Sequence, residues 1–138
     1  MKPTAAKSKL VTVPETPSTT EVVKLTNGQV LYLRTSIQQV ANMKIPFDVS
    51  YAVVRNTAVV EAETAVIEKM RSKFVEAHLP EGQKEITQAD AQFKPFMDDY
   101  TKFLNQTTEL KLQLINTDDL KSLTLTPATV NGLVPMFK

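Results

Sequence analysis

The sequence predicts an α+β fold that is mainly α: a long central helix flanked by two shorter helices, with a small two- or three-stranded sheet and a short C-terminal helix. Two observations carry this prediction. Residues 47–77 contain neither Gly nor Pro and repeat apolar side chains at intervals of seven, as a long amphipathic helix does. Leu alternates with polar residues over 110–114, which is the period of a half-buried strand.

The composition indicates one domain with an N-terminal arm. A chain of 138 residues with 42% hydrophobic content is large enough to bury one core. We therefore expect a single helical domain with a small sheet over residues 21–138. Residues 1–20 are rich in Pro and Thr and predict a flexible arm, because such segments bury too little apolar surface to offset their ordering entropy. An arm that docks on a partner is the alternative interpretation.

The segment around Asn27-Gly28 allows two interpretations. Asn-Gly between two apolar runs is typical of a β-hairpin turn. Against the hairpin, Thr26 and Gln29 match a capping box, the pattern that opens many helices. We favour a helix over residues 28–43, because apolar residues recur at helical spacing beyond the reach of a hairpin, at Val30, Leu33, Ile37 and Val40.

The long helix is predicted to begin after Pro46 and to run over 47–77. Asn56 and Glu63 place polar side chains where a coiled-coil seam prefers apolar ones. Packing of the apolar stripe against helices of the same chain is therefore favoured, and a homo-oligomer formed through this stripe is the alternative. Asn56 is also a candidate for a buried polar residue that sets the register. The predicted stripe consists of Val53, Val60, Ile67 and Phe74, widened by Ala52, Val59, Val66 and Met70.

The third helix is predicted to follow a connection that contains Pro80 and Gly82. The segment 87–90 is typical of a helix N-terminus. Pro95 predicts either a kink or a first short turn, with the main helix beginning near Lys94. One face is expected to carry the contacts with the long helix, through Phe93, Phe96, Met97, Tyr100 and Leu104.

The strand over 110–114 requires a partner in a sheet. The other β-prone segments are 22–25 and 123–125, and these are the expected partners. Thr126-Pro127 then predicts a short C-terminal helix, with Thr as N-cap and Pro in the first turn. This helix is expected to end near Pro135 and to carry Val130, Leu133 and Val134.

The residue types that carry most catalytic and metal chemistry are scarce, because the chain has no Cys and one His. His78 lies near the predicted end of the long helix beside Glu76 and Glu81, where its cationic form would stabilise the helix C-terminus. The acidic pairs 98–99 and 118–119 are sequence neighbours, which point about 100° apart on a helix and cannot chelate one ion together. Three Gly allow no phosphate-binding loop. We therefore predict that the protein is not an enzyme and has no catalytic, cofactor or metal site.

The charge balance bears on the partner. The formal net charge of +1 favours neither nucleic acid nor an anionic membrane. No apolar stretch is long enough to cross a membrane, and the first residues lack the apolar core of a signal peptide, so we expect a protein that is neither membrane-spanning nor secreted. A protein partner is predicted. The candidate interaction residues cluster about one turn apart near the start of the long helix: Tyr51, Arg55 and Asn56.

Short motifs resemble a family of small uncharacterised proteins encoded by tailed phages and prophages. These motifs are Leu25-Thr26-Asn27-Gly28, Met43-Lys44-Ile45-Pro46, Tyr51 and Arg55-Asn56, with Glu61 and Glu63 beyond. The resemblance covers residues 21–138 and implies a short strand, a helix, an Ile-Pro step, a long helix and a closing segment of alternating Leu. The family supplies a phage context and no established activity.

Together these features predict a non-enzymatic phage protein, a minor virion or assembly component that acts through protein–protein contacts. The alternative is a host-directed inhibitor that binds a bacterial enzyme or defence component. Either function places the protein in the virion or in the host cytoplasm.

Overall fold

The computed structural model describes residues 20–138, so the predicted arm lies outside the described residues except for Thr20, which begins the first strand. The chain is α+β and mainly α, as predicted. Its elements follow in the order β1 (Thr20–Thr26), α1 (Asn27–Ala41), α2 (Phe47–His78), α3 (Phe93–Leu104), β2 (Thr107–Gln113), the 3-10 helix η1 (Thr117–Leu120), α4 (Pro127–Leu133) and the 3-10 helix η2 (Val134–Met136).

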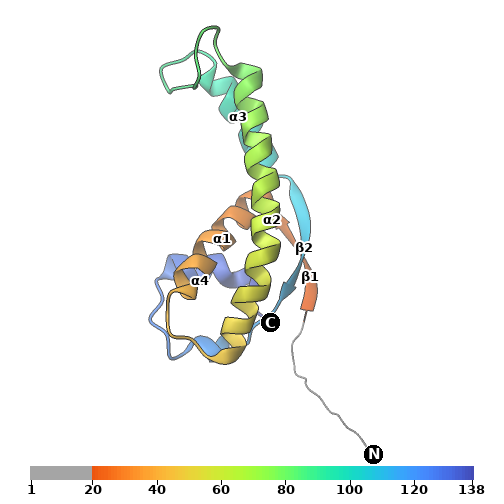
Figure 1. Ribbon diagram of the computed structural model, residues 1–138, viewed down its shortest axis with the longest axis vertical. Helices are drawn as coiled ribbons and strands as arrows, with labels where there is room; N and C mark the ends of the chain where they lie inside the picture. Colours follow the sequence, from red (N-terminus) through yellow and green to blue (C-terminus); the bar gives the residue numbers. More distant parts are fainter. Residues whose placement is uncertain (1–19) are drawn as a thin grey trace, which may run out of the picture.

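Helix α2 runs through most of the length of the described structure (Figure 1). Around its N-terminal half, α1, α4 and the β1–β2 sheet form the body of the protein, which contains most of the buried core. Its C-terminal half projects from the body and packs against α3 as a helical hairpin. The predicted long helix flanked by two shorter ones is confirmed, since both α1 and α3 pack against α2.

The entry into α1 confirms the helical interpretation, and the hairpin alternative is wrong. The capping box is complete: Thr26 Oγ1 accepts from Gln29 N at 3.0 Å, and Thr26 N donates to Gln29 Oε1 at 2.8 Å. Asn27 makes no hairpin turn, because its Nδ2 donates to Phe103 O and its N donates to Gln106 O, both beyond α2. The local turn signal is overridden by these long-range hydrogen bonds.

The sheet has two strands, with β1 and β2 antiparallel in the described structure. The pairing of 22–25 with the alternating Leu segment is confirmed, and Val23 lies opposite Leu110. The segment 123–125 is not a third strand. Asn56 of α2 already bonds the main chain of Gln113 at the far edge of β2, and the chain leaves the sheet through η1.

The predicted long helix is observed as Phe47–His78, one residue longer than expected. Val53, Val60 and Ile67 are buried within the chain, so the apolar stripe is not free to form a homo-oligomer. Val66 was expected to widen this stripe, and that prediction is wrong because its side chain is 52% exposed. Consecutive helical residues point about 100° apart, and Ile67 faces the core.

Helix α3 begins at Phe93, close to the alternative start near Lys94. The segment 87–90 is a turn and not a helix start, because Asp90 Oδ2 accepts from Thr87 N at 2.7 Å and closes it. Pro95 is the third residue of α3, where the missing N–H costs no intrahelical hydrogen bond, so no kink is required. Phe96 is the one residue of this helix that is buried, and the other predicted contact residues are half-buried.

The C-terminal helix starts as predicted, with Thr126 Oγ1 accepting from Thr129 N at 3.2 Å. Helix α4 ends at Leu133, and Pro135 lies in η2. Leu133 is buried in the core, whereas Val134 is exposed. The switch from α-helix to 3-10 helix at Val134 turns this side chain outward and corrects the expectation that it belongs to the α-helix.

Ionisation of the Tyr100 hydroxyl is expected to make the stability of the protein depend on pH in the alkaline range. Burial raises the pKa of its hydroxyl above the ordinary value of 10.0, and Glu68 raises it further, while Arg71 acts in the opposite direction. A pKa raised in the folded state stabilises the protein fully below about pH 10, and this contribution is lost as the pH rises through the folded-state value. In urea titrations at about pH 8 and about pH 11, we expect Tyr100→Phe to lose less stability on alkalinisation than the wild type. Equal losses would contradict this expectation.

Candidate functional site

The large apolar side chains that remain exposed fall into two groups on the described structure. One group lies on the side of α2 that faces away from the body, at Phe47, Tyr51 and Val54, whereas Val66 stands apart from it, about three turns farther along the helix. The other consists of Val22, Tyr32 and Val134, which come from β1, α1 and η2. Scattered exposed apolar residues are ordinary, whereas such groups mark contact surfaces.

The first group is the better candidate for a primary binding site because helical spacing aligns its members. We define the outer face of α2 as the exposed residues Phe47, Tyr51, Val54, Arg55, Ala58 and Ala62. They recur at intervals of three and four, so they lie on one side of the helix. The side chains that α2 buries, such as Val53 and Val60, point to the opposite side. The core therefore fixes which side of the helix is presented.

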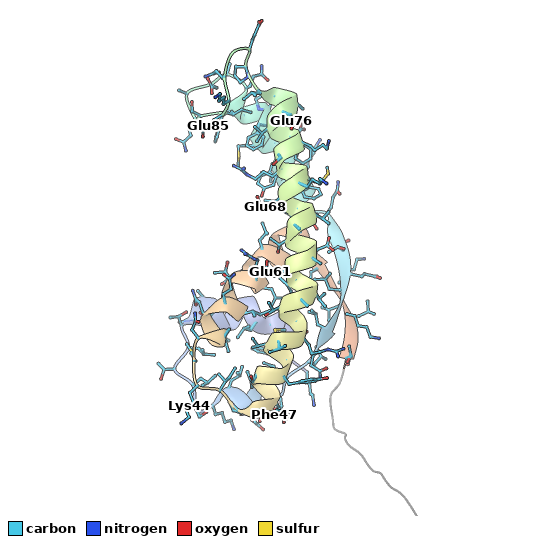
Figure 2. All side chains as sticks on the ribbon, viewed as in Figure 1. Lys44, Phe47, Glu61, Glu68, Glu76 and Glu85 are labelled. Carbon is cyan, nitrogen blue, oxygen red and sulfur yellow. The ribbon has the colours of Figure 1, made fainter. Side chains whose placement is uncertain are left out.

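An aromatic and cationic stack forms the first two turns of the outer face. The rings of Phe47 and Tyr51 are stacked, with centroids 6.5 Å apart and planes 12° apart. The Arg55 guanidinium lies 5.9 Å from the centroid of the Tyr51 ring on the next turn. Phe47 is 79% exposed and stands at the end of α2 opposite the hairpin (Figure 2).

These residue types suit protein recognition. Tyr and Arg are enriched at the energetic centres of protein interfaces, since a ring adds large contact area at little entropic cost and a guanidinium adds directed donors. The stack holds Tyr51 between two neighbours, so its ring is partly ordered before a partner arrives. At the flank, Glu61 Oε2 accepts from Arg34 Nε at 2.9 Å, which ties the helix to α1.

The structure brings Tyr51 and Arg55 together and separates Asn56 from them. Asn56 is 1% exposed. Its Nδ2 donates to Gln113 O at 2.9 Å and its Oδ1 accepts from Gln113 N at 2.7 Å. The side chain is therefore fully occupied inside the protein, in the register-setting position that the sequence also allowed. As an interaction residue, Asn56 is corrected to a structural one.

Phe47 and Val54 belong to the outer face but were not predicted as interaction residues. They are identified by their angular position around the helix. Spacings of four and three from Tyr51 place both on its side of the helix, away from the seven-residue line of buried side chains.

No group of three or more His, Cys, Asp or Glu residues able to hold a metal ion occurs within residues 20–138. His78 is the last residue of α2, as its predicted place at the helix end requires, and its Nε2 lies 2.7 Å from Asp99 Oδ2 on α3. This contact joins the two helices of the hairpin near its tip. The neighbouring carboxylates diverge, since Asp98 pairs instead with Lys94 at 3.0 Å.

In the part of the chain that the structure describes, no helix combines the length and the apolar character needed to cross a bilayer. Comparison of the chain with protein-family models, with curated proteins and with solved structures found no match.

Proposed function

We propose that this chain is a non-enzymatic docking protein that binds another protein through the outer face of α2. The observation that carries the proposal is Phe47, a large aromatic side chain left 79% exposed and stacked on Tyr51. Burying apolar surface against a partner is favourable by about 25 cal/mol per Å². Arg55, packed over the same ring, adds donors at the edge of this contact and gives it specificity.

The setting that we propose is a phage assembly, in which the chain is a minor virion or assembly component. The support is the resemblance of residues 21–138 to the tailed-phage family. The rigid attachment of the outer face to the core also suits a part that must hold a fixed orientation. A host-directed inhibitor would use the same face on a bacterial protein, and the identity of the bound partner separates the two functions.

The identity of the partner can be determined by photo-crosslinking. A photoreactive phenylalanine analogue at position 51 is incorporated while particles are produced from the genome that encodes the chain, and cross-linked peptides are identified by mass spectrometry. We expect the chain in purified particles, cross-linked from position 51 to a phage structural protein. Absence of the chain from particles, with cross-links to a host protein alone, would support the inhibitor and contradict the virion component.

Substitutions test the face itself. Phe47→Ser and Arg55→Glu are expected to weaken capture of the cross-linked partner by about tenfold or more each, because they remove the anchor and reverse the charge at its edge. Stability should change by no more than about 0.5 kcal/mol, since both side chains are exposed. Val66→Ser is the matched control, an exposed apolar residue on the same helix outside the outer face. Undiminished capture by both variants would refute the site.

A further inference from the structure

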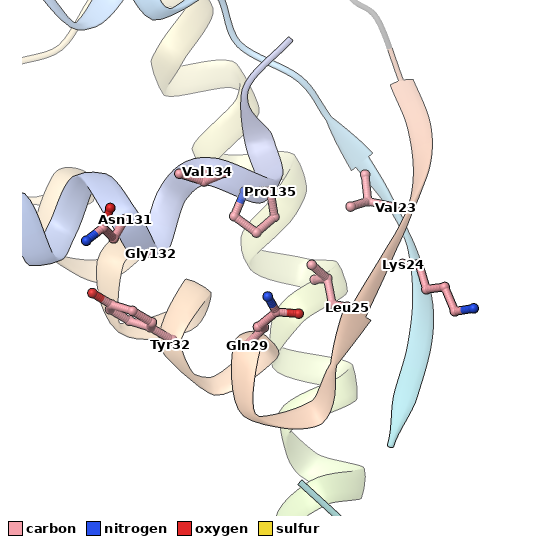
Figure 3. Close-up of a pocket in the computed structure, with 9 residues that line it drawn as sticks. All are labelled: Val23, Lys24, Leu25, Gln29, Tyr32, Asn131, Gly132, Val134 and Pro135. Carbon is pink, nitrogen blue, oxygen red and sulfur yellow. The ribbon is translucent and has the colours of Figure 1, made fainter. Parts of the chain in front are cut away.

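A pocket lies between β1, the start of α1 and the α4–η2 segment (Figure 3). Its volume is about 420 Å³. Tyr32 and Val134 line it, and Val22 precedes its lining residue Val23 on β1. The pocket is separate from the outer face of α2, because no residue of α2 lines it.

The hydrogen-bond pattern of the sheet shows which main-chain groups of β1 point away from β2. In an antiparallel pair, alternate residues bond the partner strand and the others turn their N–H and C=O outward. Asn27 N donates to Gln106 O at 2.9 Å, and this bond continues the hydrogen-bond ladder of the sheet. The odd-numbered residues of β1 therefore direct their main-chain N–H and C=O groups toward β2. Gln113, opposite Thr20, turns its N–H and C=O away from β1 to Asn56. Both observations leave Val22 and Lys24 with outward-facing main-chain groups.

Both edges of the sheet carry outward main-chain groups, some of which are covered by side chains, but the pocket adjoins β1 alone. At β2, the side chain of Asn56 satisfies the outward groups of Gln113. At β1, the N–H of Thr26 is taken by Gln29 in the capping box. Among residues 20–138, the outward main-chain groups of Val22 and Lys24 have no hydrogen-bond partner. An uncovered edge strand is a template for another strand.

The pocket and the free edge adjoin one another. Lys24 lines the pocket although its side chain points away from it, so it contributes its main chain (Figure 3). The neighbouring residues Val23 and Leu25 direct their side chains to the pocket side of β1, and Pro135 faces them from η2 (Figure 3). A strand placed about 4.8 Å from the free edge of β1 would send alternate side chains into this space.

We propose that β1 and the pocket bind an extended segment of a partner protein, which adds to the sheet as a third strand. The main-chain groups of Val22 and Lys24 pair with the segment, and an apolar, β-branched side chain of the segment enters the pocket. The segment is uncharged at that position, since the side chains that face the pocket are apolar or neutral, among them Tyr32, Gln29 and Asn131. The protein therefore has a docking surface besides the outer face of α2, and this inference does not rest on the proposed function.

A model peptide tests the proposal on the full chain. The probe is a capped seven-residue peptide of alternating Thr and Val, titrated into isotope-labelled protein and followed by amide chemical shifts. We expect shifts concentrated at Val22, Lys24 and Tyr32. Shifts confined to the outer face of α2, or amides of Val22 and Lys24 already protected from exchange in the full chain without peptide, would overturn the proposal. The second outcome would mean that the chain itself covers this edge.

Two matched comparisons identify the edge. Lys24→Pro removes an outward N–H at a position where an edge strand tolerates Pro, and we expect it to weaken peptide binding about tenfold or more. Lys111→Pro is the control, because Lys111 occupies the equivalent outward position on the opposite strand. N-methylation of the peptide at the alternate residues that face β1 should abolish binding, whereas N-methylation at the residues that face away should not. This comparison tests the strand pairing without any change to the protein. Equal binding of the two methylated peptides would refute strand addition.

Discussion

Asn56→Ala is expected to lower the free energy of unfolding by about 3 kcal/mol, more than any other truncation of a polar side chain in α2. The substitution leaves the N–H and C=O of Gln113 without their partner at a site where Asn56 is 1% exposed. A buried main-chain group without a partner costs about 1–3 kcal/mol. Urea unfolding, compared at equal slope, measures the loss.

Thr64→Val is the matched control for this prediction. Thr64 lies on the same buried side of α2, and its Oγ1 is the one buried side-chain polar atom without a hydrogen-bond partner in the described structure. Replacing that hydroxyl by a methyl group is expected to leave stability unchanged or to raise it by up to about 1 kcal/mol. If Asn56→Ala were as mild as Thr64→Val, the hydrogen bonds to Gln113 would not stabilise the fold.

Gly132→Ala is expected to destabilise the protein by about 2–3 kcal/mol because α4 packs closely on α1 at this position. A Cβ at residue 132 would lie 1.9 Å from Ser36 Oγ and 2.8 Å from Ser36 Cβ, so one helix must move. Ser36 is itself buried and has little room to retreat. Thermal or urea unfolding gives the magnitude.

A second substitution tests whether the clash with Ser36 causes the loss of stability in Gly132→Ala. Ser36→Gly removes both clashing atoms, so the double variant is expected to be less destabilised than the sum of the single variants by about 1 kcal/mol or more. Gly28→Ala is the control, since its nearest neighbour would be Leu104 O at 3.5 Å, an ordinary contact. Additive effects of the two substitutions would show that the clash does not set the cost.

The elements of the fold follow from local patterns in the sequence. The capping box at Thr26 and the helical spacing after it predicted α1, and the absence of Gly and Pro predicted α2 to within one residue. These features depend on neighbours a few residues away, so the sequence alone displays them. The alternation of Leu residues identified β2 for the same reason.

The errors arise where the deciding contact is distant in sequence. Asn56 is named both as an interaction residue and as a buried residue that sets the register, and its bond to Gln113, 57 residues away, decides for the second. The sequence places His78 at the end of the long helix, but it does not show that Asp99 contacts it from across the hairpin. The segment 123–125 forms no third strand, and the sequence pattern of a β-prone run does not show whether another strand lies beside it. Of the candidate site, Tyr51 and Arg55 lie together as the sequence indicated, and Phe47 and Val54 required knowledge of which side of α2 is buried.

A single uninterrupted helix belongs both to the body and to the hairpin. The 32 residues of α2 extend about 48 Å, and each residue adds about 1.5 Å and 100°. A partner bound at Phe47 is therefore held at a set distance and rotational angle from anything bound near the tip of the hairpin. Insertion of one residue in the projecting part of α2 would turn the α2 side chains beyond it by about 100° relative to α3, which stays tied to the body through Asn27. A change of one residue in helix length would therefore alter the direction of these side chains strongly, while it changes the length of the helix by only about 1.5 Å.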